Sequence, residues 1–146
     1  MFELITNRTQ SDVDYAENLS KKGWLQMTAE EQAEWLNGLK GAYNHTDLNR
    51  VERAVAEISV LFGLNLTTKT DWTAWDIPKQ SDLDRFLENI RKIVAKSTTY
   101  TDTPTLPQSM SKLTYTSAND IEKILMDISK IEPTLFRCNE AYCGEV

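Results

Sequence analysis

The sequence predicts a mainly α-helical fold, with five to six short helices in a compact bundle. Two patterns carry this prediction: apolar residues recur at steps of three and four, and residues typical of helix caps flank these segments. A third observation is size, because 146 residues, 40% of them hydrophobic and 26% charged, suit one soluble globular domain. We therefore expect residues 1–146 to form a single helical domain.

The first half is expected to hold three short helices, a cluster that spans residues 11–63. The strongest periodicity of the chain lies here, in Leu48, Val51, Val55, Ile58 and Phe62. Ser, Thr and Asp side chains cap helix N-termini, often with an acid three residues later. The caps that this pattern predicts are Ser11 with Asp14, Thr28 with Glu31, and Thr46 or Asp47. The three helices are expected to end at Gly23, Gly41 and Gly63.

The second half begins with a change of pattern. Residues 64–70 start by alternating apolar with polar side chains, so they could pair with 113–116 as a small two-stranded β element. An aromatic loop over 68–80, a helix over 82–96 and a connector over 98–112 are expected next. One or two C-terminal helices follow over 117–142, because Pro133 either kinks a helix or begins a sixth one. The expected caps are Ser81 with Asp84, and Thr116 or Ser117.

The chain is acidic, with 22 Asp and Glu against 16 Lys and Arg and a net charge of -6. Proteins that bind nucleic acids through phosphates cluster their Lys and Arg residues. Here the longest basic runs are pairs, so we expect no nucleic-acid partner. Acids at helix starts offset the helix dipole, and the excess is interpreted as this effect rather than as a charged docking surface. The acids at or near predicted N-termini are Asp12, Asp14, Glu30, Glu31, Asp47, Asp82, Asp84, Asp120 and Glu122.

Motifs for catalysis or cofactor binding are not found in the sequence. His45 is the only histidine, so a multi-His metal site cannot form, and no phosphate loop or nucleophile elbow occurs. Acid pairs such as Asp71 with Asp76 are explained by turns, where Asp bonds the local backbone. We therefore expect a protein that is not an enzyme, with no catalytic residue, no cofactor and no metal. Cys138 and Cys143 are expected to be free thiols, because their spacing fits neither a zinc pair nor a redox motif.

The tryptophans have two interpretations. Exposed aromatic rings beside Asp side chains could contact a partner protein or a flat sugar ring. The residues of that hypothesis are Tyr43, Asp71, Trp72, Trp75 and Asp76. The alternative, which we favour, is that Trp24, Trp35 and Trp72 fill a small helical core. Trp75 is expected to be the most exposed of the four, because it lies in the middle of a loop.

A targeting segment is not expected at the N-terminus, which lacks the charged and long apolar regions of a signal peptide. No stretch of the sequence approaches the apolar length of a membrane span. We therefore expect no membrane partner.

Four blocks of the sequence resemble a family of small structural proteins. They are KGW from Lys22, MTAEEQAEWLNGLKGAYNHTDLNRVE from Met27, KTDWTAWDIP from Lys69 and LTYTSANDIEKIL from Leu113. Proteins that look like this are encoded in the tail and baseplate modules of phages and prophages of Gram-positive bacteria, and in phage-tail-like bacteriocins. The block GAYN-x-TDLNRVE is the most distinctive. Cys143 stands where the family pattern has Ser, so no family role is carried to it.

The resemblance implies a non-enzymatic virion protein of the tail or baseplate, made in the bacterial cytoplasm. Its implied partners are other tail or baseplate proteins, with several copies in a symmetric assembly. The aromatic loop and the connector are its expected contact elements. Two alternatives remain open: a carbohydrate-binding module that touches the host cell wall through Trp72 and Trp75, and a small regulatory protein of the mobile element.

Overall fold

Over residues 3–144, five α-helices and one short 3-10 helix make up the regular structure in a computed structural model of the chain. The model describes the backbone of residues 3–144 and the side chains of residues 3–131. The elements in chain order are α1 (Gln10–Lys22), η1 (Trp24–Gln26), α2 (Ala29–Asn37), α3 (His45–Leu61), α4 (Gln80–Lys96) and α5 (Tyr115–Gly144). The prediction of a mainly α fold with five to six helices is confirmed.

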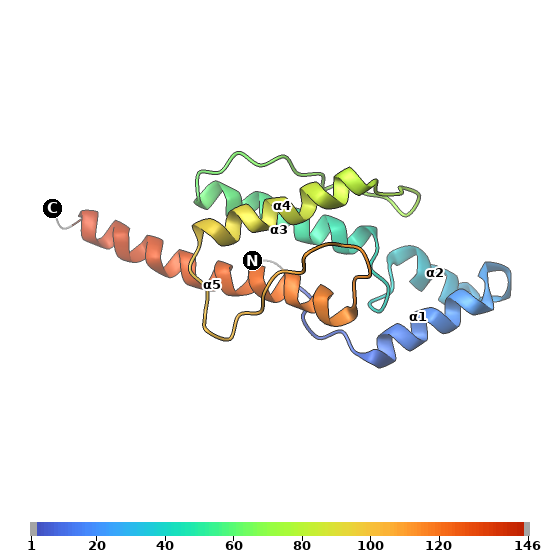
Figure 1. Ribbon diagram of the computed structural model, residues 1–146. Coiled ribbons are helices and arrows are strands. Elements are labelled where there is room, and N and C mark those ends of the chain that lie inside the picture. The colour runs from blue at the N-terminus through green and yellow to red at the C-terminus, as the bar shows by residue number, and fades with distance from the viewer. Residues whose placement is uncertain (1–2, 145–146) are drawn as a thin grey trace.

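The main core lies between α3, α4 and α5, which run side by side in Figure 1. Each helix contributes apolar residues three or four positions apart, so that one face of each helix is buried. The fully buried members are mostly β-branched, and they include Val51, Ile58, Ile90, Ile121 and Ile128. Burial of this apolar surface is the main stabilising term of the bundle.

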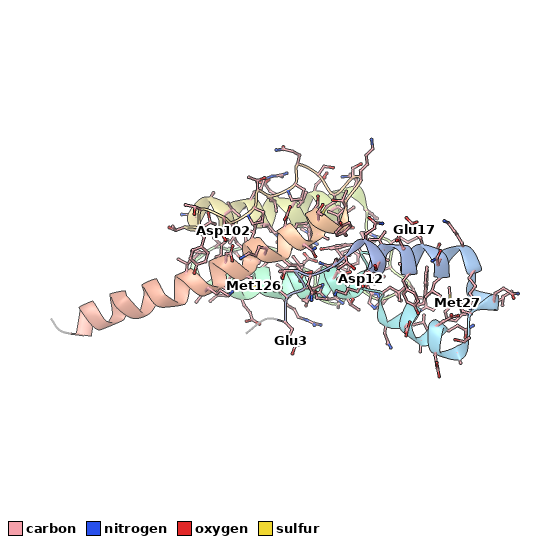
Figure 2. All side chains as sticks on the ribbon, turned by 90° about the horizontal axis from the view of Figure 1, so that it is seen from below. Glu3, Asp12, Glu17, Met27, Asp102 and Met126 are labelled. Carbon is pink, nitrogen blue, oxygen red and sulfur yellow. The ribbon has the colours of Figure 1, made fainter. Side chains whose placement is uncertain are left out.

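A smaller second core lies in the lobe formed by α1, η1 and α2, at one end of the molecule (Figure 1). Ala16 and Leu19 of α1 pack there with Met27 and Leu39. Figure 2 labels Met27 within this lobe. The first two helices therefore have a core of their own, while α3 shares its core with α4 and α5.

The predicted helix starts lie close to the observed ones, but most of the predicted caps are wrong. Thr28 caps α2 with Glu31 as predicted, whereas α1 is capped by Thr9 with Asp12 instead of Ser11 with Asp14. The sequence around α1 holds two overlapping capping boxes, and the structure uses the earlier one. The other observed starts are Asn44 with Asp47 for α3, Lys79 with Asp82 for α4, and Thr114 with Ser117 for α5.

Asn44 replaces the predicted cap at Thr46 or Asp47 for a physical reason. Its side-chain oxygen accepts a hydrogen bond from the Thr46 backbone N–H at 2.9 Å. Its amide nitrogen donates to the carbonyls of Leu39 and Ala42 in the preceding turn. A hydroxyl cannot both donate twice and accept, so only an amide joins this turn to the helix.

The expected C-terminal elements form one continuous helix, α5, which carries Pro133 within it. A separate sixth helix after Pro133 is therefore not present. The end of α5 projects beyond the bundle, opposite to the lobe of α1 and α2 (Figure 1). Cys138 and Cys143 lie outside the described side chains, so their state stays a prediction. None of the helices over the described residues has the length and apolar character to cross a membrane.

The small β element is wrong, because residues 3–144 contain no strand. Residues 64–70 are irregular, and the carbonyls of Thr67 and Thr70 accept hydrogen bonds from side chains of α4 and α3, respectively. The Thr67 carbonyl accepts hydrogen bonds from Arg85 and Asn89, both at 2.8 Å. At the other segment, Thr114 begins α5. The helical side chains thus take the place of a partner strand.

The connector between α4 and α5 is held against the bundle at two points. Arg91 donates to the Gln108 carbonyl at 2.8 Å, and Thr103 donates to the buried Asp127 at 2.6 Å. Leu106 and Met110 of the connector pack on the main core. The apolar side chains of the connector therefore help to stabilise the main core.

Gly41 is expected to be essential for docking α1 against the turn after α2. A Cβ atom at this position would overlap the backbone carbonyl of Asp12, which cannot move aside as a side chain can. Gly41→Ala is expected to lower the free energy of unfolding by about 1–3 kcal/mol. Urea denaturation measures this change.

Gly63→Ala is the matched control for Gly41→Ala. Nothing lies within 4 Å of a Cβ at Gly63, but its φ of 63° strains an L-residue. The control therefore reports backbone strain alone, about 1 kcal/mol. Equal stability of Gly41→Ala and the unchanged chain would contradict the close approach.

Candidate functional site

A groove of about 700 Å³ opens between the α1–α2 lobe and the main bundle. All four tryptophans of the chain line this groove, although they come from three separate segments. Apolar side chains of the lobe, of α3, of α4 and of the segment before α5 also line it, among them Leu36, Leu39, Leu48, Leu83 and Met110. We call this feature the aromatic groove.

One wall of the aromatic groove is α2, a helix whose apolar side chains are partly exposed to solvent. All nine residues of α2 are described, and none of them is buried. Trp35 and Leu36 are 37% and 40% exposed. A short helix is stable in water only when an apolar face is packed. The exposed parts of Trp35 and Leu36 are therefore available for contact with a partner.

Trp72 forms part of the groove but is held from behind by α3. Its side chain is 7% exposed, and its indole N–H donates to Glu52 at 2.9 Å. Asn49 pairs with both the backbone N–H and the carbonyl of Trp72, each at 2.8 Å. Lys69 lies over the indole ring, 4.8 Å from its centre. The interpretation of Trp72 as a core residue with a satisfied N–H is confirmed.

Trp24 and Trp35 are not core residues, in contrast to the interpretation that we favoured. Trp24 is 43% exposed, and both rings line the groove. The reason is that the lobe has a small core, which Leu19, Met27 and Leu39 already fill. The small core of the lobe has no room for an additional indole ring.

Trp75 is the most exposed of the four tryptophans, at 85%, as predicted. It lies in a tight turn that Asp76 closes, because one carboxylate oxygen accepts from the Thr73 N–H at 2.7 Å and from the Thr73 hydroxyl at 3.0 Å. These hydrogen bonds, the backbone one first, lower the pKa of Asp76. The turn is thus fixed while the ring stands in solvent.

Tyr43 lines the groove and also packs against the main core. It packs edge-on against Phe86, with ring centres 6.5 Å apart and an interplanar angle of 86°. Burial, and then the charge of Asp47, raise the pKa of the Tyr43 hydroxyl well above its usual value. Tyr43 is therefore neutral in the folded protein.

The structure brings together four of the five residues named from the sequence: Tyr43, Trp72, Trp75 and Asp76 line the groove. Asp71 is outside the lining and pairs with Lys69 at 2.8 Å. Sequence reasoning missed Trp35 and Leu36 as groove residues, whereas Trp24 was a further candidate for an exposed aromatic platform. The signal was present in α2, where Trp35 and Leu36 follow a run of acids and Gln with few apolar partners.

A second feature that sequence reasoning missed is a buried charge network beside the groove. Glu122 of α5 is 0% exposed, and it pairs with Arg8 and Arg50, both at 2.7 Å. Asp47 pairs with the same two arginines. Glu122 also accepts from the Ile5 backbone N–H at 2.6 Å. The network therefore ties the N-terminal segment to α3 and α5.

The buried acids of the fold are all held by internal partners, which indicates a structural role. Glu52 pairs with Arg85, and Asp127 pairs with Lys123 at 2.5 Å. Among the described residues, no group of three or more His, Cys, Asp or Glu side chains is arranged to hold a metal ion. The groove lining thus offers the fold's main exposed chemistry, which is aromatic and apolar.

The turn that Asp76 closes is expected to lose stability in acid. The folded-state pKa of Asp76 is below the value of 3.8 for an unperturbed Asp. A carboxyl whose pKa is lowered by folding stabilises the fold at pH values above the pKa of the unfolded chain. This stabilisation is lost as the pH falls through the folded-state pKa. Asp76→Asn is therefore expected to flatten the fall of Tm between about pH 4 and pH 2, as followed by thermal unfolding.

Asp120→Asn is the control for the acid effect, because its sign is opposite. Burial raises the pKa of Asp120, so this carboxyl favours the fold as the pH falls. The Asp120→Asn variant should show a steeper acid loss than the unchanged chain. If Asp76→Asn followed the unchanged chain at every pH, the assigned role of this carboxylate would be wrong.

Comparison of the chain with protein-family models, with curated proteins and with solved structures gives no match.

Proposed function

We propose that this chain is a non-enzymatic structural component of a phage tail or baseplate, or of a phage-tail-like particle. The observation that carries the proposal is the aromatic groove, with its uncovered α2 wall and the exposed Trp75. A large exposed apolar surface on a small soluble domain marks a site of protein–protein contact. The resemblance of the sequence blocks to tail and baseplate proteins supplies the class of assembly.

The expected partners are other tail or baseplate proteins, and the location is the virion. Tail assemblies are symmetric, so several copies per particle are expected. The connector, by contrast, is bound to α4 and α5 through Arg91 and Asp127. Of the two contact elements that the sequence suggested, the aromatic loop with the exposed Trp75 is therefore the stronger candidate.

Mass spectrometry of purified particles from the host that encodes the chain tests this proposal. The expected result is a stoichiometric signal that co-purifies with tails or baseplates. Absence of the chain from intact particles would overturn the proposal and favour the regulatory protein.

A genetic version of the test addresses the groove itself. Trp75→Ala or Leu36→Ser in the encoding element is expected to reduce incorporation into particles. Val60→Ser is the matched control, because Val60 is an exposed apolar residue of α3 outside the groove. Equal loss in the control would show that the groove is not the contact.

The carbohydrate-binding alternative is altered by the burial of Trp72. An exposed coplanar pair of Trp72 and Trp75 does not form, because the Trp72 indole is buried and donates to Glu52. A sugar platform would have to use Trp75 with Trp24 or Trp35 instead. Glycan-array binding that is lost in Trp75→Ala would favour that function.

A further inference from the structure

We propose that the aromatic groove binds a basic amphipathic helix of a partner protein. The inference deepens the proposed function, because it names the chemistry of the partner that occupies the same groove. Three observations carry it: the apolar lining, the internal use of the polar lining groups, and the charge of the groove walls.

The lining is suited to an apolar stripe on a helix. Trp24, Trp35 and Leu36 of the lobe face the same groove as Trp75 and the floor residue Leu83. An amphipathic helix binds by laying residues of one face into such a groove. Aromatic residues at the centre of a protein contact carry most of its binding energy. The groove thus has the composition of a helix-binding surface.

Four polar side chains of the lining are used inside the fold, those of Asn44, Trp72, Thr73 and Asp76, whereas the buried Tyr43 hydroxyl has no hydrogen-bond partner among the described residues. The Asn44 amide caps α3 and donates to two carbonyls of the preceding turn. Thr73 donates to Asp76, and both belong to the turn that carries Trp75. A sugar needs free donors and acceptors for its hydroxyl groups, whereas an apolar helix face does not. These hydrogen bonds favour a peptide over a glycan.

The two walls carry most of the net charge of the chain. The α2 wall, residues 28–37, has three acids and no base, and the loop wall, residues 68–84, has four acids and two bases. Their combined charge is therefore -5, out of -6 for the whole chain. Lys22 pairs with Glu31 and Lys69 pairs with Asp71, which leaves five acids against Lys79. The acids that remain are Glu30, Glu34, Asp76, Asp82 and Asp84; Asp76 lines the groove itself, and the other four lie on the same two segments outside the lining.

This excess of acids favours a partner whose contact surface is positively charged. Complementary charge around an apolar contact steers association and suppresses wrong partners. A partner helix with Lys or Arg beside its apolar stripe matches both walls. A second copy of this chain would bring its own acidic walls to the contact, so self-association through the groove is disfavoured.

Fluorescence anisotropy with a labelled probe peptide tests the proposal on the full chain. The probe has about 18 residues, with Leu at helical spacing on one face and Lys on the other. The expected result is saturable binding that weakens about tenfold between about 0.05 M and 0.5 M salt, since the charge contribution is screened. A shift of the tryptophan emission should accompany binding, because all four tryptophans line the groove.

Three variants locate the binding. Trp75→Ala and Leu36→Ser are expected to weaken binding about tenfold or more, whereas Val60→Ser should leave it within about twofold. Far-UV circular dichroism checks that each variant is folded. Equal weakening by Val60→Ser would overturn the assignment to the groove.

Two altered peptides test separately the basic charge and the apolar helix face of the proposed partner. A peptide with Glu in place of every Lys should not bind, and equal binding of this peptide would overturn the basic character. A peptide of the same composition with a scrambled order lacks the apolar face and should bind weakly. Equal binding of the scrambled peptide would overturn the helix-in-groove contact.

Other occupants are separate outcomes. A concentration-dependent dimer of the chain alone that Trp75→Ala disrupts would replace the partner helix by a second copy. A tryptophan response to cell-wall oligosaccharides, with none to the Lys peptide, would replace it by a glycan. If the chain is found in particles but binds no basic helix, this inference fails while the proposed function stands. If it binds the probe but is absent from particles, the proposed function fails alone.

Discussion

Glu122→Gln is expected to lower the free energy of unfolding by about 3–5 kcal/mol, because it removes one charge from a buried network. The carboxylate has no exposed surface, and it faces Arg8 and Arg50 at 2.7 Å. Gln keeps the size of the side chain and can still accept from Ile5. The loss of stability is therefore electrostatic, since Arg8 stays buried and keeps Asp47 as its one acidic partner. Urea denaturation at neutral pH measures it.

Two further variants separate this effect from simple loss of an acid on α5. Asp120→Asn removes a neighbouring carboxyl that burial disfavours in its charged form, so the stability should change by no more than about 0.5 kcal/mol. Arg8→Met combined with Glu122→Gln removes both members of one buried pair. The double variant should lose less than the sum of the single changes. Strict additivity would show that the two residues do not interact.

The helices were predictable from the sequence because their apolar spacing is strong. In α3, the period from Leu48 to Ile58 places one face in the core, and the structure buries that face. Helix starts were less predictable, since Thr9-x-x-Asp12 and Ser11-x-x-Asp14 fit the same pattern. The choice between them depends on contacts with the rest of the fold. Strand pairing at 64–70 failed for the same reason, because helix side chains satisfied the backbone.

Charge was the least predictable property, because an acid at a helix start has several uses. Asp47 and Glu122 were assigned to helix dipoles, yet both are buried with arginines. Glu122 is four residues after Ala118, on the inward stripe of α5, and this position was the signal for a buried role. Seven of the 22 acids lie on residues 28–37 and 68–84, the two segments that form the groove walls, so the charge of these segments bears on the partner that we propose.

Trp72→Ala is expected to destabilise the fold by about 3–5 kcal/mol, because a buried indole is removed from the main core. The change also leaves Glu52 with Arg85 alone, after loss of the indole N–H at 2.9 Å. Asn49 would still bind the backbone of residue 72, so the loop should remain near α3 but pack loosely. Thermal unfolding and the emission spectrum of the remaining tryptophans measure the effect.

Trp75→Ala is the matched comparison, and its stability should stay within about 0.5 kcal/mol of the unchanged chain. The Trp75 side chain is 85% exposed, and its turn is closed by Asp76 and Thr73 rather than by the ring. Binding lost in Trp75→Ala therefore reports contact, whereas binding lost in Trp72→Ala reports damage to the wall that carries it. A large loss of stability in Trp75→Ala would contradict this assignment. The same two rings, three residues apart, thus separate the part of the loop that builds the groove from the part that we propose contacts a partner.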